Sequence, residues 1–169
     1  MRILITERLT LEPQTARHAE EMYPVMCDPA IYEFENEPPK SMEWLRGRYA
    51  RLESRKSPDG HEQWLNWVIR LADGTVIGYV QATLDAPARA TIAYELGSRW
   101  WGQGYASEAV RAMLDELLQN YGVFDFYATY KKKNHRSAKL LRRLDFVNCE
   151  GGPGTPKVET AEVLMYLGC

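Results

Sequence analysis

The chain has 169 residues, of which 45% are hydrophobic, and this apolar content excludes a disordered or fibrous protein. Its 21 basic and 23 acidic residues leave a formal net charge of -2, so the molecule as a whole has no electrostatic attraction to nucleic acid or to an anionic membrane. Three cysteines without a C-x-x-C pair argue against a disulfide framework and against a zinc site.

The N-terminus becomes charged before a signal-peptide core could form. No later apolar run approaches the roughly 20 residues of a membrane-spanning helix. We therefore expect a cytoplasmic protein with no membrane partner and no bound metal.

Hydrophobic spacing in the first third of the chain predicts a strand followed by two helices. Alternating apolar residues predict a strand over residues 3–11, which Pro13 ends. Apolar residues at helical spacing predict helices over 15–26 and 41–54, and Ser41 is placed to cap the second.

The middle of the chain is rich in β-forming residues. Runs at 64–71 and 76–84 are separated by an Asp-Gly pair, a strong hairpin signal, and a third run at 90–96 should continue the antiparallel meander.

An amphipathic helix is predicted over 105–121, with Gly122 at its end, followed by a strand at 123–130, a helix at 135–144 and a strand at 161–167. A strand, helix, strand order at short spacing implies a crossover between parallel strands. The sequence therefore predicts one mixed α/β sheet with helices packed on it.

A glycine-containing turn, Arg99-Trp-Trp-Gly-Gln-Gly-Tyr-Ala-Ser-Glu108, joins the strand at 90–96 to the helix at 105–121. The first amides of a helix lack intrahelical partners and lie at the positive end of the helix dipole, so they can bind an anion. Gly102 and Gly104 lack the Cβ atoms that would block phosphate oxygens and permit positive φ. The alternative is that both glycines only permit a tight turn.

Other phosphate-binding motifs fit this turn less well. A P-loop would need Gly-Lys-Ser or Gly-Lys-Thr, and a dinucleotide fingerprint would need a third glycine where Ser107 stands.

The stretch from Tyr94 to Ala109 resembles the acyl-CoA pyrophosphate motif of the GNAT superfamily of N-acetyltransferases. Within it, the motif Trp-Gly-x-Gly-Tyr-Ala-x-Glu-Ala is similar to that of the RimJ/RimL-like ribosomal-protein acetyltransferase branch. A second similarity is Asn134-x-x-Ser137 followed by Leu-Leu-Arg-Arg-Leu-Asp-Phe146.

That resemblance implies the GNAT fold, an α/β (α+β mixed) arrangement with helices on both faces of a twisted, mostly antiparallel sheet of six to seven strands. Its parallel pair would be the strands on either side of the helix at 105–121. Residues 1–169 would then form a single N-acetyltransferase domain.

The same resemblance implies an enzyme that uses acetyl-CoA as co-substrate and transfers acetyl to a primary amine by direct attack in a ternary complex. The acceptor would be a protein N-terminal amine, for example of a ribosomal protein, or a small-molecule amine, and the enzyme would form a homodimer. The residues that would bind the cofactor are Leu96, Trp101, Gly102, Gln103, Gly104, Tyr105, Ala106 and Asn134. For Asn134 the alternative is an ordinary helix N-cap.

Acyl transfer from a thioester to an amine needs a neutral nucleophile, a donor for the oxyanion and a proton for the thiolate. Strand amides near Leu96 would polarise the carbonyl, and Glu95 would accept the ammonium proton, provided that partial burial raises its pKa. A solvent-facing Glu95 is the alternative. Many GNAT enzymes place a tyrosine acid where this chain has Leu141, so Ser137 is the candidate proton donor. Asp145 replaces the glycine that the family usually has before Phe146.

The acceptor is expected to enter over the loop between the first two helices, where Glu33, Glu35 and Glu37 would attract a cationic amine. The alternative is a solvated loop. Four aromatic residues are candidates for an apolar wall beside the thioester: Tyr32, Phe34, Trp64 and Trp67. We expect at least two of them to pack in the core instead.

Two rival functions stay open. The basic residues of segment 131–143 would suit a nucleic-acid-binding module, although leucines alternate with the charges as on an ordinary amphipathic helix. A non-catalytic acyl-CoA-binding protein would keep the pyrophosphate turn without a working acid or base.

Overall fold

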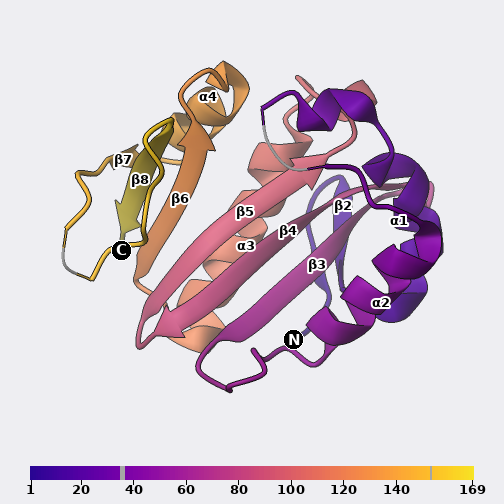
Figure 1. The fold of residues 1–169 in the computed structure, drawn as a ribbon, viewed down its shortest axis with the longest axis horizontal. Coiled ribbons are helices and arrows are strands. Elements are labelled where there is room, and N and C mark those ends of the chain that lie inside the picture. Colours follow the sequence, from indigo (N-terminus) through magenta and orange to yellow (C-terminus); the bar gives the residue numbers. More distant parts are fainter. Residues whose placement is uncertain (35–36, 153) are drawn as a thin grey trace.

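The computed structural model describes residues 1–34, 37–152 and 154–169. In these ranges the strands form one eight-stranded sheet with the order β1-β2-β3-β4-β5-β6-β8-β7 (Figure 1). The strands are β1 (Leu4–Ile5), β2 (Leu9–Pro13), β3 (Gln63–Leu71), β4 (Val76–Ala86), β5 (Arg89–Leu96), β6 (Asp125–Lys131), β7 (Val147–Asn148) and β8 (Glu162–Gly168).

In the described part of the chain, four α-helices pack on this sheet and three short 3-10 helices lie in the connections. The α-helices are α1 (Ala19–Met26), α2 (Met42–Glu53), α3 (Tyr105–Tyr121) and α4 (His135–Arg143). The 3-10 helices are η1 (Ala16–His18), η2 (Pro29–Tyr32) and η3 (Ser98–Trp100). The Ser41 side chain accepts a hydrogen bond from the Trp44 N–H, which confirms the predicted N-cap of α2.

Strand β5 pairs with β6 in parallel, and the other neighbouring strands pair antiparallel. Helix α3 makes the crossover between the two parallel strands. The predicted mixed, mostly antiparallel sheet is confirmed, and the GNAT arrangement that the resemblance implied is present.

The predicted strand count of six to seven was too low by at least one. Residues 3–11 form two strands because the Thr6 N–H donates to the Leu9 carbonyl and turns the chain. Strand β7 was not predicted, since both of its residues are exposed and carry no burial pattern.

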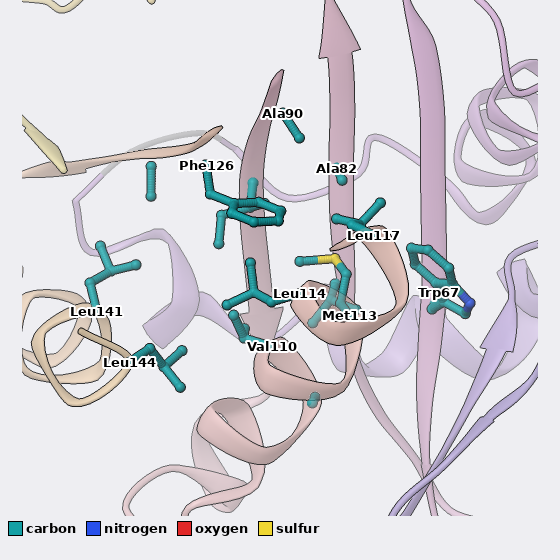
Figure 2. Close-up of a cluster of buried hydrophobic side chains, with 14 of the residues drawn as sticks. Trp67, Ala82, Ala90, Val110, Met113, Leu114, Leu117, Phe126, Leu141 and Leu144 are labelled. Carbon is teal, nitrogen blue, oxygen red and sulfur yellow. The ribbon is translucent and has the colours of Figure 1, made fainter. Parts of the chain in front are cut away.

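Helices cover both faces of the sheet, as the alternation of side chains along β3 shows. Leu65 and Trp67 belong to the core beneath α3 and α4, whereas Val68 packs with α1 and α2. Figure 2 shows the larger core, in which the apolar stripe of α3 faces the strands. The labelled members are Trp67, Ala82, Ala90, Val110, Met113, Leu114, Leu117, Phe126, Leu141 and Leu144.

Helix α4 ends in a Schellman motif, which sets the direction of the backbone that enters β7. The Phe146 N–H donates to the Leu141 carbonyl at 3.0 Å and the Asp145 N–H to the Arg142 carbonyl at 3.1 Å. Asp145 has φ 67°, the left-handed conformation that glycine adopts most easily. Position 145 is therefore left-handed, and the aspartate found there in place of the family's usual glycine adopts this conformation at a higher cost.

Replacing Asp145 with glycine is expected to stabilise the fold by about 0.5 to 1 kcal/mol, because glycine relieves the left-handed strain and removes a negative charge from a helix C-terminus. Thermal denaturation should show a rise in Tm of about 1–4 °C. Asp145→Asn is the matched control, since asparagine removes only the charge. A lower Tm for Asp145→Gly would contradict this account.

A network of charged side chains joins β2, β3 and α1. Arg70 donates to Glu12 Oε2 at 3.0 Å and to Glu21 Oε2 at 2.6 Å, and His18 Nε2 lies 3.1 Å from Glu12 Oε2. The hydrogen bonds from Arg70 lower the pKa of both carboxyl groups and outweigh the opposing effect of burial. Their stabilising contribution is therefore complete above the usual glutamate pKa of about 4.3 and is lost as pH falls through the lowered values.

Arg70→Met is expected to lower the free energy of unfolding by about 1 to 2 kcal/mol at pH 7, because two partly buried carboxylates lose their cation. The difference from the wild type should shrink below pH of about 4. Urea denaturation at both pH values measures it. Arg46→Met removes an exposed ion pair with Glu20 and should change stability by less than about 0.5 kcal/mol. A difference that persists at low pH would show that Arg70 acts through packing alone.

Candidate functional site

A cleft of about 390 Å³ opens where the two parallel strands separate. The β5–β6 ladder joins Arg89–Thr91 to Asp125–Tyr127, whereas β5 continues to Leu96 and β6 to Lys131. Figure 1 shows the two strands diverging toward α4. The cleft is lined by the later residues of both strands, by the turn before α3 and by one side of α4.

The glycine-containing turn has the geometry expected of an anion site. Gly102 has φ 76° and Gly104, the N-cap of α3, has φ 83°. The Glu108 N–H bonds to the Gly104 carbonyl, so the three preceding helical amides, those of Tyr105, Ala106 and Ser107, precede the first intrahelical hydrogen bond. Gly102, Gly104, Tyr105, Ala106 and Ser107 all line the cleft.

Side chains from the turn between β1 and β2 contact the glycine-containing turn and the first turn of α3. Arg8 donates to the Gln103 carbonyl at 2.9 Å and to Glu108 Oε2 at 2.7 Å, and its guanidinium lies 4.6 Å from the centre of the Tyr105 ring. Thr6 donates to Glu108 Oε1 at 2.6 Å. Burial works against the Glu108 carboxylate, but the bonds from Thr6 and Arg8 prevail and lower its pKa. Sequence reasoning missed this clamp because Arg8 and Glu108 lie 100 residues apart.

Gly78 permits the end of β5 to approach β4 closely. A Cβ at this position would lie 2.1 Å from the Glu95 carbonyl oxygen and 2.8 Å from the Leu96 Cα, which are backbone atoms and cannot rotate away. The Gly97 N–H donates to the Ile77 carbonyl at 3.0 Å and holds the strand end in this position. Gly78 therefore places Glu95 and Leu96 at the cleft, a role that the sequence reading did not assign.

Gly78→Ala is expected to destabilise the protein by about 2 kcal/mol, because the added methyl group must push the β5 backbone aside. The same displacement should move Leu96 and weaken ligand binding in the cleft. Chemical denaturation and a binding titration measure the two effects. Gly47→Ala is the control, since a Cβ there meets nothing within 4 Å and should slightly stabilise α2. Unchanged stability of Gly78→Ala would contradict the tight approach.

The two residues expected to do acid–base chemistry both line the cleft. Glu95 is half-buried and stands opposite Tyr79 in the β4–β5 ladder. Ser137, in the first turn of α4, forms a hydrogen bond of 2.6 Å with the phenol of Tyr94. Sequence reasoning did not single out Tyr94, whose partner comes from a different element.

Asn134 lines the cleft and also caps α4. Its side-chain oxygen accepts a hydrogen bond of 3.0 Å from the Ser137 N–H. The N-cap alternative is therefore observed, and the cap fixes the position of Ser137. Leu141, which replaces the tyrosine of many GNAT enzymes, is fully buried in the core and has no access to the cleft.

One arginine of α4 connects the cleft to the segment after η2. The Arg136 guanidinium lies 4.1 Å from the centre of the Trp101 ring and 5.6 Å from that of Phe34, and it donates to Glu33 Oε2 at 2.9 Å. The Trp101 indole N–H in turn donates to the Leu96 carbonyl at 2.8 Å. Gln103, one of the expected cofactor-binding residues, is exposed and is not among the residues that line the cleft. Its backbone carbonyl accepts the hydrogen bond from Arg8.

The residues considered for the acceptor side have different environments. Phe34 lines the cleft, whereas Trp67 is fully buried and donates to the Arg2 carbonyl, so it belongs to the core. Trp64 is on β3 and donates to Glu62, and Tyr32 donates to the Met26 carbonyl. Glu33 is paired with Arg136 and Glu37 is exposed, while Glu35 lies outside the described residues.

The basic segment is partly neutralised. Lys131 pairs with Glu159 and Glu162, and Arg136 pairs with Glu33. Ala138 and Leu141 are buried, as expected for an amphipathic helix on the sheet. Three of the basic side chains line the cleft: Arg136, Lys139 and Arg143.

Cleft, turn and strand separation together fit a thioester cofactor with a pyrophosphate. The turn offers amides without a Cβ obstacle, and the separated strands leave room for an extended arm beside Leu96. These features suit a ligand that carries a pyrophosphate on an extended arm.

Residues 8–147 match the model of the acetyltransferase (GNAT) domain, and the chain belongs to this family of acetyl-CoA-dependent N-acetyltransferases. It is 28% identical over 148 residues to "Uncharacterized N-acetyltransferase p20" of Bacillus licheniformis, a match that covers 86% of this chain and 83% of that protein.

Among solved structures, the fold is similar to RimL, the ribosomal L7/L12 α-N-protein acetyltransferase, in complex with coenzyme A. The TM-score is 0.80 at 18% identity, covering 98% of this chain and 96% of RimL. The ribosomal-protein-S5-alanine acetyltransferase of Vibrio fischeri gives a TM-score of 0.80 at 17% identity, covering 99% and 97%.

None of the helices in the described ranges combines the length and apolar character needed to span a bilayer. The described part of the chain also contains no group of three or more His, Cys, Asp or Glu side chains that could hold a metal ion.

Proposed function

We propose that residues 1–169 form one N-acetyltransferase domain that transfers acetyl from acetyl-CoA to a primary amine by direct attack in a ternary complex. The observation that carries this proposal is the pair of positive-φ glycines at the start of α3, beside strands that separate after Thr91 and Tyr127. One feature suits a pyrophosphate and the other an extended pantetheine arm.

The residues that would hold the cofactor keep the roles that the family resemblance implied. Amides from Trp101 to Ala106 would bind the pyrophosphate, and the end of β5 near Leu96 would pair with the pantetheine arm. The Leu96 carbonyl already accepts from Trp101, so the arm would pair with the strand through other backbone groups. Asn134 would act through its cap on α4.

The reaction assigned to the cleft needs the amine to lose a proton and the sulfur to leave as a thiolate. Glu95 would accept the amine proton directly or through water, because it lines the cleft at the end of the strand that Gly78 positions. Ser137, in the first turn of α4, would donate a hydrogen bond to the departing sulfur.

A protein N-terminal amine is the acceptor that we favour. The solved structures similar in fold include enzymes named for ribosomal proteins, and they support the RimJ/RimL-like branch. The segment that would border the acceptor carries an exposed carboxylate at Glu37, which would attract a cationic amine, whereas Glu33 is already paired with Arg136. The protein would act as a cytoplasmic enzyme, and as a homodimer.

Calorimetric titration with acetyl-CoA, coenzyme A and 3′,5′-ADP tests the cofactor half. We expect micromolar binding of both CoA species and weaker binding of 3′,5′-ADP, which lacks the pantetheine arm and one phosphate of the pyrophosphate. Absence of CoA binding would overturn the proposal, and salt-sensitive binding of RNA instead would favour the nucleic-acid module.

A panel of amines then tests transfer, with N-terminal peptides of ribosomal proteins beside polyamines and free lysine, and mass spectrometry as the readout. Acetylation of an N-terminal peptide is the expected result. CoA binding without turnover of any amine would favour the non-catalytic acyl-CoA-binding alternative.

A further inference from the structure

We propose that Tyr94 is a positioning residue that turns the Ser137 hydroxyl toward the sulfur of coenzyme A, so that the pair stabilises the leaving thiolate. This inference rests on the proposed function and adds to it a residue that neither the sequence motifs nor the comparisons assign.

Tyr94 and Ser137 meet across the opening between the separated strands. Tyr94 is on β5 and Ser137 is on α4, which follows β6, and their oxygens are 2.6 Å apart. Both residues line the cleft. Their hydrogen bond therefore spans the place where β5 and β6 no longer pair.

The chemistry of the two hydroxyls decides which one donates. A phenol is a stronger acid than an aliphatic alcohol, so we assign the donor role to the Tyr94 O–H and the acceptor role to the Ser137 oxygen. Burial raises the pKa of Tyr94 to about 12. Tyr94 thus keeps its proton at neutral pH and is a permanent donor.

With its oxygen occupied by Tyr94, Ser137 has its own hydrogen available for an acceptor inside the cleft. The backbone of Ser137 is also fixed, because its N–H donates to the Asn134 side chain at 3.0 Å. One hydrogen bond therefore fixes the backbone of Ser137 and the other directs its hydroxyl. Such preorganised donors stabilise charge that develops in a transition state.

The step balances without net proton loss from the pair. The amine nitrogen forms a bond to the carbonyl carbon, the carbon–sulfur bond breaks, and its electron pair goes to sulfur, which accepts a hydrogen bond from Ser137. The proton released by the amine leaves through Glu95 or water, and the thiolate takes its proton from solvent. Tyr94 and Ser137 are unchanged at the end.

Spectroscopic titration of bound coenzyme A tests this inference without an acceptor amine. The ultraviolet absorbance of the thiolate reports the pKa of the bound thiol, and a parallel titration with desulfo-coenzyme A, which has no thiol, subtracts the tyrosines. A hydrogen bond to the thiolate lowers the thiol pKa. We expect Ser137→Ala and Tyr94→Phe each to raise it by up to about one pH unit, with the double variant equal to Ser137→Ala alone.

Tyr127→Phe is the matched control, because it removes a phenol from β6 that packs on Tyr166 and should leave the thiol pKa unchanged. Equal thiol pKa values in the wild type, Ser137→Ala and Tyr94→Phe would overturn the inference. Because coenzyme A would still bind in that case, the proposed function would not be affected. Additive effects in the double variant would also overturn it, since Tyr94 would then act independently of Ser137. A wild type that does not bind coenzyme A would overturn both.

Discussion

Replacing Gly104 with alanine is expected to weaken coenzyme A binding by about 100-fold. A non-glycine residue at φ 83° is strained by about 1 to 2 kcal/mol, and the added Cβ would lie 3.3 Å from Arg8 Nη2. Relief of that strain turns the amides away from the phosphates, and each charge-assisted hydrogen bond lost costs about 1.5 to 3 kcal/mol. Calorimetry of the variant against the wild type measures the change, at about 1.4 kcal/mol for each factor of ten.

Gly74→Ala is the matched control for this variant. Gly74 has φ 90° in the turn between β3 and β4, so alanine there carries a similar strain without touching the cleft. It should lower Tm and leave coenzyme A affinity unchanged. Equal affinities of the Gly104→Ala variant and the wild type would show that the turn does not bind the pyrophosphate.

Glu95→Gln is expected to lower kcat/KM for the acceptor amine by about 100- to 1,000-fold at neutral pH, because glutamine keeps the shape of the side chain but cannot accept a proton. Coenzyme A affinity should change by less than about twofold, since no phosphate contact is involved. The loss should shrink above pH of about 8, where an N-terminal amine is already deprotonated. A pH–rate profile of both proteins measures this dependence.

Glu33→Gln provides the control, since it removes another carboxylate near the cleft that is exposed and paired with Arg136. Its effect on kcat/KM should be less than about threefold, in keeping with the small energies of exposed ion pairs. A Glu95→Gln enzyme with unchanged kcat/KM at neutral pH would exclude Glu95 as the base.

Local patterns were enough to predict most of the elements and the position of the glycine-containing turn before α3. The helix at 105–121 has its predicted bounds, and Gly122 ends it in a left-handed conformation. The glycine-containing turn could be predicted because its conformation depends on residues that are neighbours along the chain. The single strand expected at 3–11 was wrong because a turn bond between Thr6 and Leu9 is not visible in an alternating pattern.

Contacts between distant segments escaped the sequence reading. Tyr94 and Ser137 are 43 residues apart, and Arg8 reaches Glu108 over 100 residues, so no local spacing connects them. In the sequence Gly78 does not differ from an ordinary strand glycine, and its role depends on the close approach of the β5 backbone. The contacts of Gly78 and Tyr94 position Glu95 and Ser137 beside the cleft, and the contact of Arg8 with Glu108 holds the start of α3.

The sequence alone determined the fold class, the family resemblance and the turn that suits a pyrophosphate, since each depends on residues that are neighbours along the chain. Only the tertiary structure decided where β5 and β6 separate, which side chains the resulting cleft brings together and which hydroxyl orients Ser137. These features depend on strand register and on packing across the sheet, which join residues that the chain keeps far apart.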